Sequence, residues 1–428
     1  MKQILLLFCV FFSLNTKAQI TTQDAAPMPE AVSNHAVALG MQNGKKYIYS
    51  FAGIDTSKVF SGIHKRCFRY DIAANEWSIL DDLPSGEGRI AAYASTVKNK
   101  IYIIGGYHVF EDTKETSYNK VHIFNPETNH FEADGTSIPV PIDDQVQAVW
   151  RDSLIYVITG WSNTDNVDKV QIYNPTKDKW MKGKPVISNS KCKAFGASGT
   201  IIGDTIYYYG GAIASGFVSA IYFRKGIINP DDPTDITWSA DKIVQKSYRS
   251  GVSTYQGIPF WLGGSQNTYN YDGVAYDGSG IVEPLGLATF YNIQKEKLFQ
   301  MDIDKKVMDL RGIVKIKDGT YFVCGGMEEG AIVTNKSFFV NMDFQTQNTD
   351  IHSSEIKLFP NPTGNRISWE KPITGEIKLF DVKGHLVMTK RIFDKKQMNI
   401  QPLIPNIYFI HFYDNNGKLV FKQRIIIK

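Results

Sequence analysis

Cationic side chains recur along the chain, each in a short stretch that precedes or opens an apolar run. They are His35 in NHAVA, Arg89 in GRIAAYA, Lys193 in CKAFGAS, Arg249 in YRSGVS and Arg311 in LRGIV. A guanidinium group binds a carboxylate through paired hydrogen bonds, so arginines that converge on one concave surface can hold an anionic saccharide or an acidic peptide. Arginines in such positions can equally bridge neighbouring structural units, and the sequence leaves both interpretations open.

Aromatic residues follow other apolar runs. They are Tyr107, Phe110, Trp161, Phe217, Tyr269, Tyr271 and Tyr276. A flat aromatic ring offers an apolar face on which a sugar ring can stack. We therefore predict a binding site for an extracellular carbohydrate or peptide. Its predicted residues are His35, Arg89, Lys193, Arg249, Arg311, Tyr107 and Trp161.

Acid–base chemistry has four candidate residues, His35, Asp143, Asp144 and Glu328, but each can also be a solvated loop residue. The eight histidines form no cluster in sequence, and the cysteines at 67, 192 and 324 have no metal-ligand spacing. No Ser-His-Asp pattern or phosphate loop is present. The sequence therefore predicts no catalytic residue, metal or cofactor. It predicts that the cysteines are free and buried.

The candidate residues lie on a repeated framework of apolar runs that end in glycine. The runs are YSFAG (49–53), IYIIGGY (101–107), YVITG (156–160), YYYGG (207–211), FWLGG (260–264) and YFVCGG (321–326). Successive final glycines are 53, 54, 51, 53 and 62 residues apart, a period that fits one four-stranded propeller blade of about 50 residues. Glycine in a strand marks a close approach of backbone, so we expect the glycines to make room for packing between blades.

A second phrase repeats between the third and fourth expected strands of each blade: YDIAANEW (70–77), FNPETNHF (124–131) and YNPTKDKW (173–180). With the glycine pairs, this spacing resembles the kelch repeat family over residues 20–344, in six blades. The expected fold class is all-β, a six-bladed kelch-type β-propeller followed by a small C-terminal β-sandwich. Residues 20–26 are expected to supply the outer strand of the last blade and so cover its edge.

The resemblance also bears on the site. Strands of a blade are antiparallel, so the start of the first strand and the Gly-Gly end of the second emerge on one face. In kelch proteins the arginines at strand starts commonly line the ligand pocket. The last repeat, LRGIVKIKDGTYFVCGGMEEG, also resembles that of sialate mutarotases. That resemblance makes a sugar-anomer enzyme the alternative to a binding module.

The two ends of the chain predict export. Residues 1–18 have Lys2 near the start, an apolar run, and a polar stretch with Lys17 that ends in the small residue Ala18, which is typical of a cleavable signal peptide. Removing them lowers the formal charge from +4 to +2, which gives no support for nucleic-acid binding. We expect no transmembrane segment in the mature chain.

Residues 345–353 are expected to form a linker. In residues 354–428, LFPNP (358–362), IKLFDVKGHLV (377–387) and the terminal KQRIIIK resemble the type A C-terminal sorting domain of the type IX (Por) secretion system of Bacteroidota. The expected propeller then spans residues 19–344. The resemblance implies the type IX machinery as a partner and a secreted or cell-surface location, reached through the periplasm.

Overall fold

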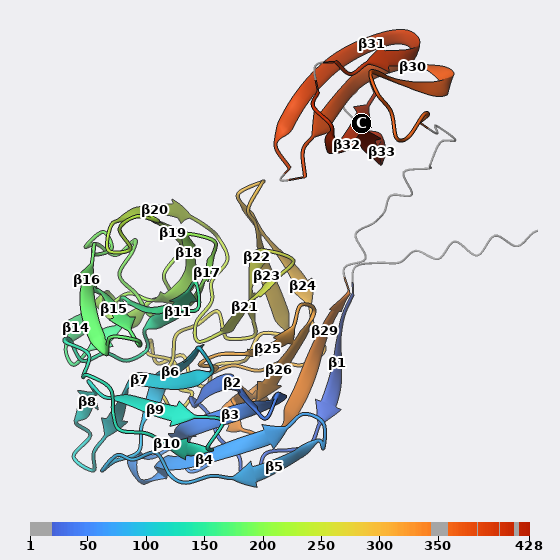
Figure 1. Cartoon of the computed structure of the whole chain (residues 1–428). Coiled ribbons are helices and arrows are strands. Elements are labelled where there is room, and N and C mark those ends of the chain that lie inside the picture. Colours follow the sequence, from blue (N-terminus) through green and yellow to red (C-terminus); the bar gives the residue numbers. More distant parts are fainter. Residues whose placement is uncertain (1–18, 344–357, 383, 402, 415–418) are drawn as a thin grey trace, which may run out of the picture. The chain divides into compact units, whose positions relative to one another are not determined.

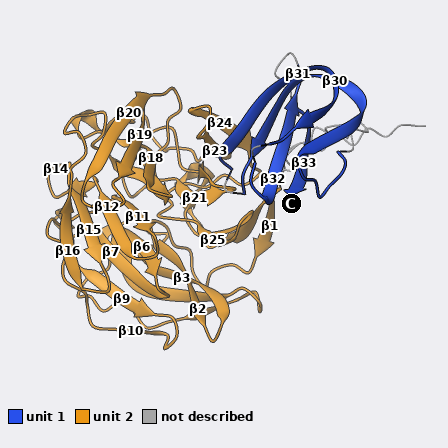
Figure 2. Ribbon diagram, turned by 45° about the horizontal axis from the view of Figure 1, so that its top comes forward, with its two compact units in different colours: residues 1–19, 344–428 blue, residues 20–343 orange. Residues whose placement is uncertain are grey.

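The computed structural model describes residues 19–343, 358–382, 384–401, 403–414 and 419–428. The chain divides into two compact units, residues 20–343 and residues 344–428 together with 1–19 (Figure 2). The predicted signal peptide (1–18) and linker (345–353) lie outside the described residues. The described chain is built of strands, with three short 3-10 helices at Phe60–Gly62, Ser215–Phe217 and Glu329–Ala331.

Six antiparallel sheets account for most of residues 19–343 (Figure 1). The first contains β2 (Ala36–Gln42), β3 (Lys45–Ile54), β4 (Ile63–Asp71) and β5 (Glu76–Ile79). The second contains β6 (Ile90–Val97), β7 (Lys100–Val109), β9 (Val121–Asn125) and β10 (His130–Phe131), with β8 (Glu115–Ser117) paired to β7. The third contains β11 (Val146–Trp150), β12 (Leu154–Ile158), β15 (Val170–Asn174) and β16 (Lys179–Gly183).

The other three sheets repeat this order. The fourth contains β17 (Phe195–Ile202), β18 (Thr205–Ala212), β19 (Tyr222–Ile228) and β20 (Ile236–Lys242). The fifth contains β21 (Gly251–Tyr255), β22 (Ile258–Leu262), β23 (Leu287–Asn292) and β24 (Lys297–Asp302). The sixth contains β25 (Val314–Lys317), β26 (Thr320–Cys324), β29 (Ser337–Asp343) and β1 (Gln19–Ala25). Two small hairpins join β13 (Trp161–Ser162) to β14 (Asp165–Asn166) and β27 (Met327–Glu328) to β28 (Ile332–Val333).

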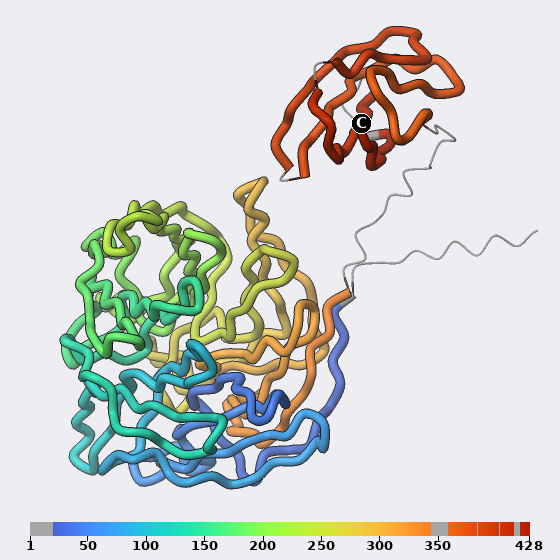
Figure 3. The backbone as a smooth tube through the Cα atoms, viewed as in Figure 1, coloured from blue at the N-terminus to red at the C-terminus, as the bar shows by residue number. Residues whose placement is uncertain are grey.

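The six sheets close into a ring. The first strand of each sheet contacts the first strand of the next, in the cyclic order β2, β6, β11, β17, β21, β25 and back to β2. The chain follows this ring once, sheet by sheet (Figure 3). Strand β1 is hydrogen-bonded beside β29 as the outer strand of the sixth sheet, which confirms the prediction for residues 20–26. One sheet therefore joins the two ends of the propeller.

The glycine pairs make room for the neighbouring sheet, as predicted. A Cβ atom built on Gly105 would lie 2.3 Å from the carbonyl oxygen of Ile142, and one on Gly210 would lie 2.1 Å from that of Ser247. Both contacts are with the chain that leads into the next sheet. Both glycines also have a left-handed φ, at +69° and +75°, which costs other residues about 1–2 kcal/mol.

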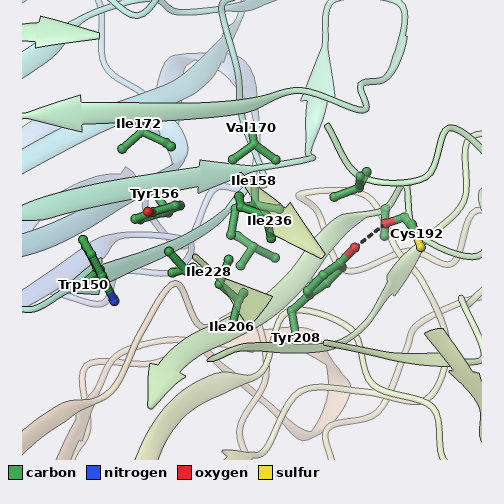
Figure 4. Packing of buried hydrophobic residues seen from close by; sticks show 14 of the residues in the cluster. Trp150, Tyr156, Ile158, Val170, Ile172, Cys192, Ile206, Tyr208, Ile228 and Ile236 are labelled. Carbon is green, nitrogen blue, oxygen red and sulfur yellow. Dashed lines mark hydrogen bonds between the residues drawn. The ribbon is translucent and has the colours of Figure 1, made fainter. Parts of the chain in front are cut away.

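Apolar side chains fill the space between consecutive sheets. Between the third and fourth sheets, Trp150, Tyr156, Ile206 and other buried residues form one cluster, in which the Tyr208 hydroxyl donates to the carbonyl oxygen of Cys192 at 2.9 Å (Figure 4). Cys67, Cys192 and Cys324 are buried free thiols. Burial raises the pKa of Cys67 and of Cys324 to about 12, which keeps both thiols protonated.

The second unit is a four-stranded antiparallel sheet in the order β31–β30–β32–β33. Its strands are β30 (Arg366–Phe380), β31 (Leu386–Asn399), β32 (Asn406–Tyr413) and β33 (Leu419–Ile427). The register of β30 against β31 shifts between Ser368 and Ile373, and such irregularities bend a strand. Residues on both sides of the shift, Ile367 and Ile377 among them, share one buried core. The layers expected of a sandwich are thus parts of one continuous sheet.

Candidate functional site

Six residues at the starts of the sheets form a hydrogen-bonded ring through their backbones. They are Asn34, Ala91, Asp144, Gly196, Arg249 and Asp309, and all have a left-handed φ, between +47° and +66°. The backbone amide of each of the first five residues donates to the carbonyl oxygen of the preceding member at 2.8–3.3 Å, and Asp309 precedes Asn34. The ring closes through Leu310, the neighbour of Asp309, whose amide donates to the carbonyl oxygen of Arg249 at 2.9 Å. The ring fixes the direction of each of these side chains. The first strands of the six sheets line the central channel of the propeller.

A pocket of about 190 Å³ lies beside this ring. It is lined by Tyr107, Glu115, Asp143, Asp144, Trp161, Phe195, Phe217, Arg249, Asn270 and Tyr276. These residues come from the second to the fifth sheets, from strand starts and from the loops that follow the glycines. The pocket therefore brings together three predicted site residues, Tyr107, Trp161 and Arg249, and two acid–base candidates, Asp143 and Asp144.

Aromatic rings form one side of the pocket. The centroid of the Trp161 ring lies 5.4 Å from that of Phe195 and 5.7 Å from that of Phe217. The Phe217 centroid lies 4.8 Å from that of Tyr276. Because these rings hold one another in edge and tilted contacts, their orientation is set before any ligand binds.

The long loop of the fifth sheet, residues 263–286, supplies Asn270 and Tyr276 to the pocket. The loop is attached to several parts of the propeller. The Lys58 ammonium group donates to the carbonyl oxygens of Asp272 and Ala331, at 2.9 and 3.0 Å. The Thr268 hydroxyl donates to the carbonyl oxygen of Phe217. The loop is therefore fixed over the face on which the pocket lies.

Buried ion pairs occupy the polar side of the pocket. The Arg249 guanidinium donates to both carboxylate oxygens of Asp144, at 3.1 and 2.7 Å, and to Asp309 at 3.1 Å. Arg311 donates to Asp144 at 2.8 Å and to the carbonyl oxygen of Gln145 at 3.3 Å. The Asp309 carboxylate also accepts from the Ser33 hydroxyl at 2.6 Å. Asp144, Arg249, Asp309 and Arg311 are at most 2% exposed, so these pairs link the third, fifth and sixth sheets across the channel.

The pKa values in this network reflect burial and the number of carboxylates. Burial, with Asp144 next to it, raises the pKa of Asp143 well above its ordinary value. Burial also raises the pKa of Asp309. Burial alone would lower the pKa of Arg249, but Asp144 and other neighbours outweigh it and hold that pKa well above its ordinary value. Arg249 is therefore charged, while Asp143 holds a proton more readily than an exposed aspartate does.

Four of the predicted binding residues do not line the pocket. His35 is buried against the last sheet, with its Nε2 atom 3.7 Å from the Cys324 sulfur, and burial lowers its pKa to about 4. Arg89 lies inside its own sheet, where it donates to Gly105 O at 3.0 Å and contacts His122 Nε2 at 2.9 Å. The other two are Lys193, whose Nζ atom lies 3.4 Å from Asp165, and Arg311, which stands behind Asp144.

Glu328, the remaining acid–base candidate, pairs with Lys336 at 2.8 Å and is not among the residues that line the pocket. Within the part of the chain that the structure describes, no group of three or more His, Cys, Asp or Glu could hold a metal ion. No helix of the described residues is long and apolar enough to cross a membrane.

Sequence reasoning missed Glu115, Phe195 and Asn270 as pocket residues. Glu115 lies on β8, which folds back along β7. Phe195 directly precedes the ring residue Gly196, as Asp143 precedes Asp144. Aligning the six sheet starts at their left-handed residues would have identified Phe195. The left-handed residues are of different types, however, so the sequence does not mark where to align the sheet starts.

Family comparisons agree with this architecture. The KLHDC2/KLHL20/DRC7 Kelch-repeats domain matches residues 6–211, and the secretion system C-terminal sorting domain matches residues 357–428. Among solved structures, one titled "Structure of YjhT" superposes with a TM-score of 0.59 at 13% identity, over 74% of this chain and 99% of that one. At this identity the likeness shows the fold.

Two curated relatives match parts of the propeller. The kelch-like protein terF of Aspergillus terreus is 27% identical over 165 residues, which are 37% of this chain and 35% of that protein. The N-acetylneuraminate epimerase of Pasteurella multocida is 28% identical over 161 residues, 35% of this chain and 42% of that protein. The chain thus spans less than half the length of either relative. The ring of sheets, its glycine pairs and the family matches show that the chain contains a kelch-repeat domain folded as a β-propeller and a type IX C-terminal sorting domain.

Proposed function

We propose that the propeller acts outside the cell as a binding module for carbohydrate or peptide, and that the chain reaches the outside through the periplasm after loss of residues 1–18. The sorting domain indicates secretion or a cell-surface location through the type IX system. The observation that carries the binding role is the pocket, whose aromatic wall faces a polar side made of Asp143, Asp144 and Arg249.

The size of the pocket favours a small ligand group. Pockets for drug-sized ligands measure about 300–1,000 Å³, whereas this pocket measures about 190 Å³. One sugar ring or one amino-acid side chain suits such a volume better than a long ligand. The rest of a larger saccharide or peptide would then extend over the face outside the pocket.

The charges of the pocket disfavour an anionic ligand. Two of the three arginines from which the sequence suggested an anion-binding site, Arg249 and Arg311, are bonded to Asp144 and Asp309 instead. An incoming anion would have to break these buried pairs, and breaking a buried pair costs about 3–5 kcal/mol. The pocket therefore suits a neutral or a cationic group.

A second candidate function is the opening and closing of a sugar ring, which needs an acid and a base at the ring oxygen and the anomeric hydroxyl. Its support is the raised pKa of Asp143, a carboxyl group that lines the pocket, since shifted pKa values mark functional sites. The relative named N-acetylneuraminate epimerase is consistent with this candidate.

The test is a glycan and peptide array probed with the wild-type protein and with Trp161→Ala. We expect wild type to bind members of one class and Trp161→Ala to lose at least tenfold in affinity, about 1.4 kcal/mol. The control is Phe299→Ala, which removes an exposed ring on the outer strand β24. Wild type that binds nothing would contradict the function, and binding that survives Trp161→Ala would contradict the site.

An NMR measurement of anomer exchange with a bound sugar separates the two candidates. Exchange that wild type accelerates and Asp143→Asn does not would favour the enzyme. Binding with no acceleration favours the binding module.

A further inference from the structure

Carboxyl groups outnumber cationic groups around the pocket. Glu115, Asp143 and Asp144 line it together with one guanidinium group, that of Arg249. Arg249 also forms an ion pair with Asp309. The charge available to a ligand therefore depends on which of these groups are already satisfied within the protein.

All three guanidinium nitrogens of Arg249, the arginine that lines the pocket, are hydrogen-bonded within the protein, whereas the buried Nε atom of Arg311 has no partner among the described residues. The Nε, NH1 and NH2 atoms of Arg249 all donate to carboxylate oxygens of Asp144 or Asp309. The NH1 and NH2 atoms of Arg311 donate to Asp144 and to the carbonyl oxygen of Gln145. Arg249 is only 1% exposed. The pocket thus has a positive charge that is fully occupied by the protein's own carboxylates.

Two carboxyl groups still have unused acceptors. Asp143 is 3% exposed, and one of its oxygens accepts from the Ser117 hydroxyl at 2.5 Å. Among the described residues, no hydrogen bond or ion pair is found for its other oxygen or for the Glu115 carboxylate, which is exposed. Within the described part of the chain, the free Asp143 oxygen is not one of the fully buried polar atoms that lack a partner, so it is open to a donor in the pocket. A ligand in the pocket can supply that donor.

The aromatic wall suits a cation as well as a sugar. Tyr107, Trp161, Phe195, Phe217 and Tyr276 line the same cavity as the two carboxyl groups. The face of an aromatic ring attracts a cation that lies within about 6 Å of its centroid. Aromatic faces and carboxyl groups with a free oxygen at one site are the combination that recognises an ammonium group. The charge of the ammonium group favours the ionised form of Asp143 and so opposes the burial that raises its pKa.

Resting on the proposed binding function, we propose that the group bound in this pocket carries a protonated amine, held by Asp143 and Glu115 and packed against the aromatic wall. The amine can belong to an amino sugar or to a lysine side chain of a peptide. Both sources present the same –NH₃⁺ group, and acetylation removes its charge in both.

Isothermal titration calorimetry at pH 6.5 tests the proposal with full-length protein. The sugar probes are D-glucosamine, N-acetyl-D-glucosamine and D-glucose, and the peptide probes are Gly-Lys-Gly with a free or an acetylated lysine amine. We expect at least one free amine to bind ten times more tightly than its acetylated form. The pair of probes that shows the preference identifies the source of the amine.

Two variants locate the preference. Asp143→Asn keeps an acceptor for Ser117, and Glu115→Gln keeps the shape of an exposed side chain. We expect each to reduce the preference for the amine at least threefold. The matched control is Glu111→Gln, an exposed carboxylate on the same loop that does not line this pocket.

Three outcomes would overturn the proposal: acetylated probes that bind as tightly as free amines, a preference that both variants retain, and no binding of any probe. The first leaves the proposed binding function intact, since a ligand still enters the pocket. If no probe binds, the amine proposal is wrong. The proposed binding function is then contradicted too only if the glycan and peptide array also shows no ligand for the wild-type protein.

Discussion

Replacing Arg249 tests whether the charges across the channel hold the propeller together. The change is Arg249→Met, which keeps an unbranched apolar side chain and removes the guanidinium group. Three hydrogen bonds to Asp144 and Asp309 are lost. Asp144 keeps Arg311 as a partner, but Asp309 is left without a cation, with Ser33 at 2.6 Å and Tyr269 at 3.4 Å as its hydroxyl donors.

The expected loss follows from the burial of these groups. Removing one partner of a buried ion pair costs about 3–5 kcal/mol, because the other charge stays buried without compensation. We therefore expect the free energy of unfolding to fall by about 3–5 kcal/mol at pH 7. Lys193→Met is the control, since Lys193 has one contact, with Asp165 at 3.4 Å, and a partly exposed pair is worth about 0–1 kcal/mol.

Urea unfolding followed by tryptophan fluorescence measures the effect, since six of the seven tryptophans lie in residues 19–343. A second substitution sharpens the test. If Asp309 is the group left uncompensated, Arg249→Met with Asp309→Asn should be less destabilised than the sum of the single variants, by about 1–3 kcal/mol. An Arg249→Met protein within 1 kcal/mol of wild type would refute the argument.

Three further predictions concern packing, pH and export. Gly210→Ala should lower the free energy of unfolding by more than about 1–2 kcal/mol, which is the cost of a left-handed φ alone. The added Cβ atom would also lie only 2.1 Å from the carbonyl oxygen of Ser247. Gly203→Ala, at a similar φ but with nothing within 4 Å, should lose less in the same urea assay, and equal losses would contradict the packing argument. Burial lowers the pKa of His64 from 6.5 to about 3, so the folded state binds the proton less well. Above pH 6.5 the histidine is neutral in both the folded and the unfolded state. As the pH falls from 6.5 toward 3, the unfolded state takes up the proton first and the folded state loses stability. His64→Phe should therefore flatten the fall in melting temperature across that window. An unchanged slope would contradict this. Deletion of residues 354–428 should leave a folded propeller in the periplasm of a host with the type IX system, as cell fractionation would show, and truncated protein in the medium would contradict it.

Repetition made the fold predictable from the sequence. The glycine-ended runs recur about every 53 residues, and each marks a place where the next sheet approaches the backbone, as Gly105 and Gly210 show. The outer position of residues 20–26 could be predicted as well, because a propeller leaves an open edge unless its two ends meet in one sheet. The C-terminal motifs likewise indicated the sorting domain that the family comparison finds.

The pocket contains only some of the predicted site residues, because the sheet starts could not be aligned from the sequence. From the ring residue to the last glycine of its sheet there are fifteen residues for Arg249 and Gly264, but nineteen for Asn34 and Gly53. The length of the hairpin between the first two strands therefore varies. Arg89 illustrates the resulting error: it stands two residues before the ring residue Ala91, and its side chain lies inside its own sheet.

The sequence by itself determined the order of the sheets and their closure into a ring. It also determined that Tyr107 and Trp161 lie on the same face as the starts of the sheets, since all three follow from local patterns that repeat. Only the tertiary structure decided what the arginines do. Arg249 and Asp144 are 105 residues apart, and no local pattern shows that their side chains meet across the channel. Because a buried charge must find its partner wherever the fold places one, the electrostatics of the pocket are a property of the closed ring.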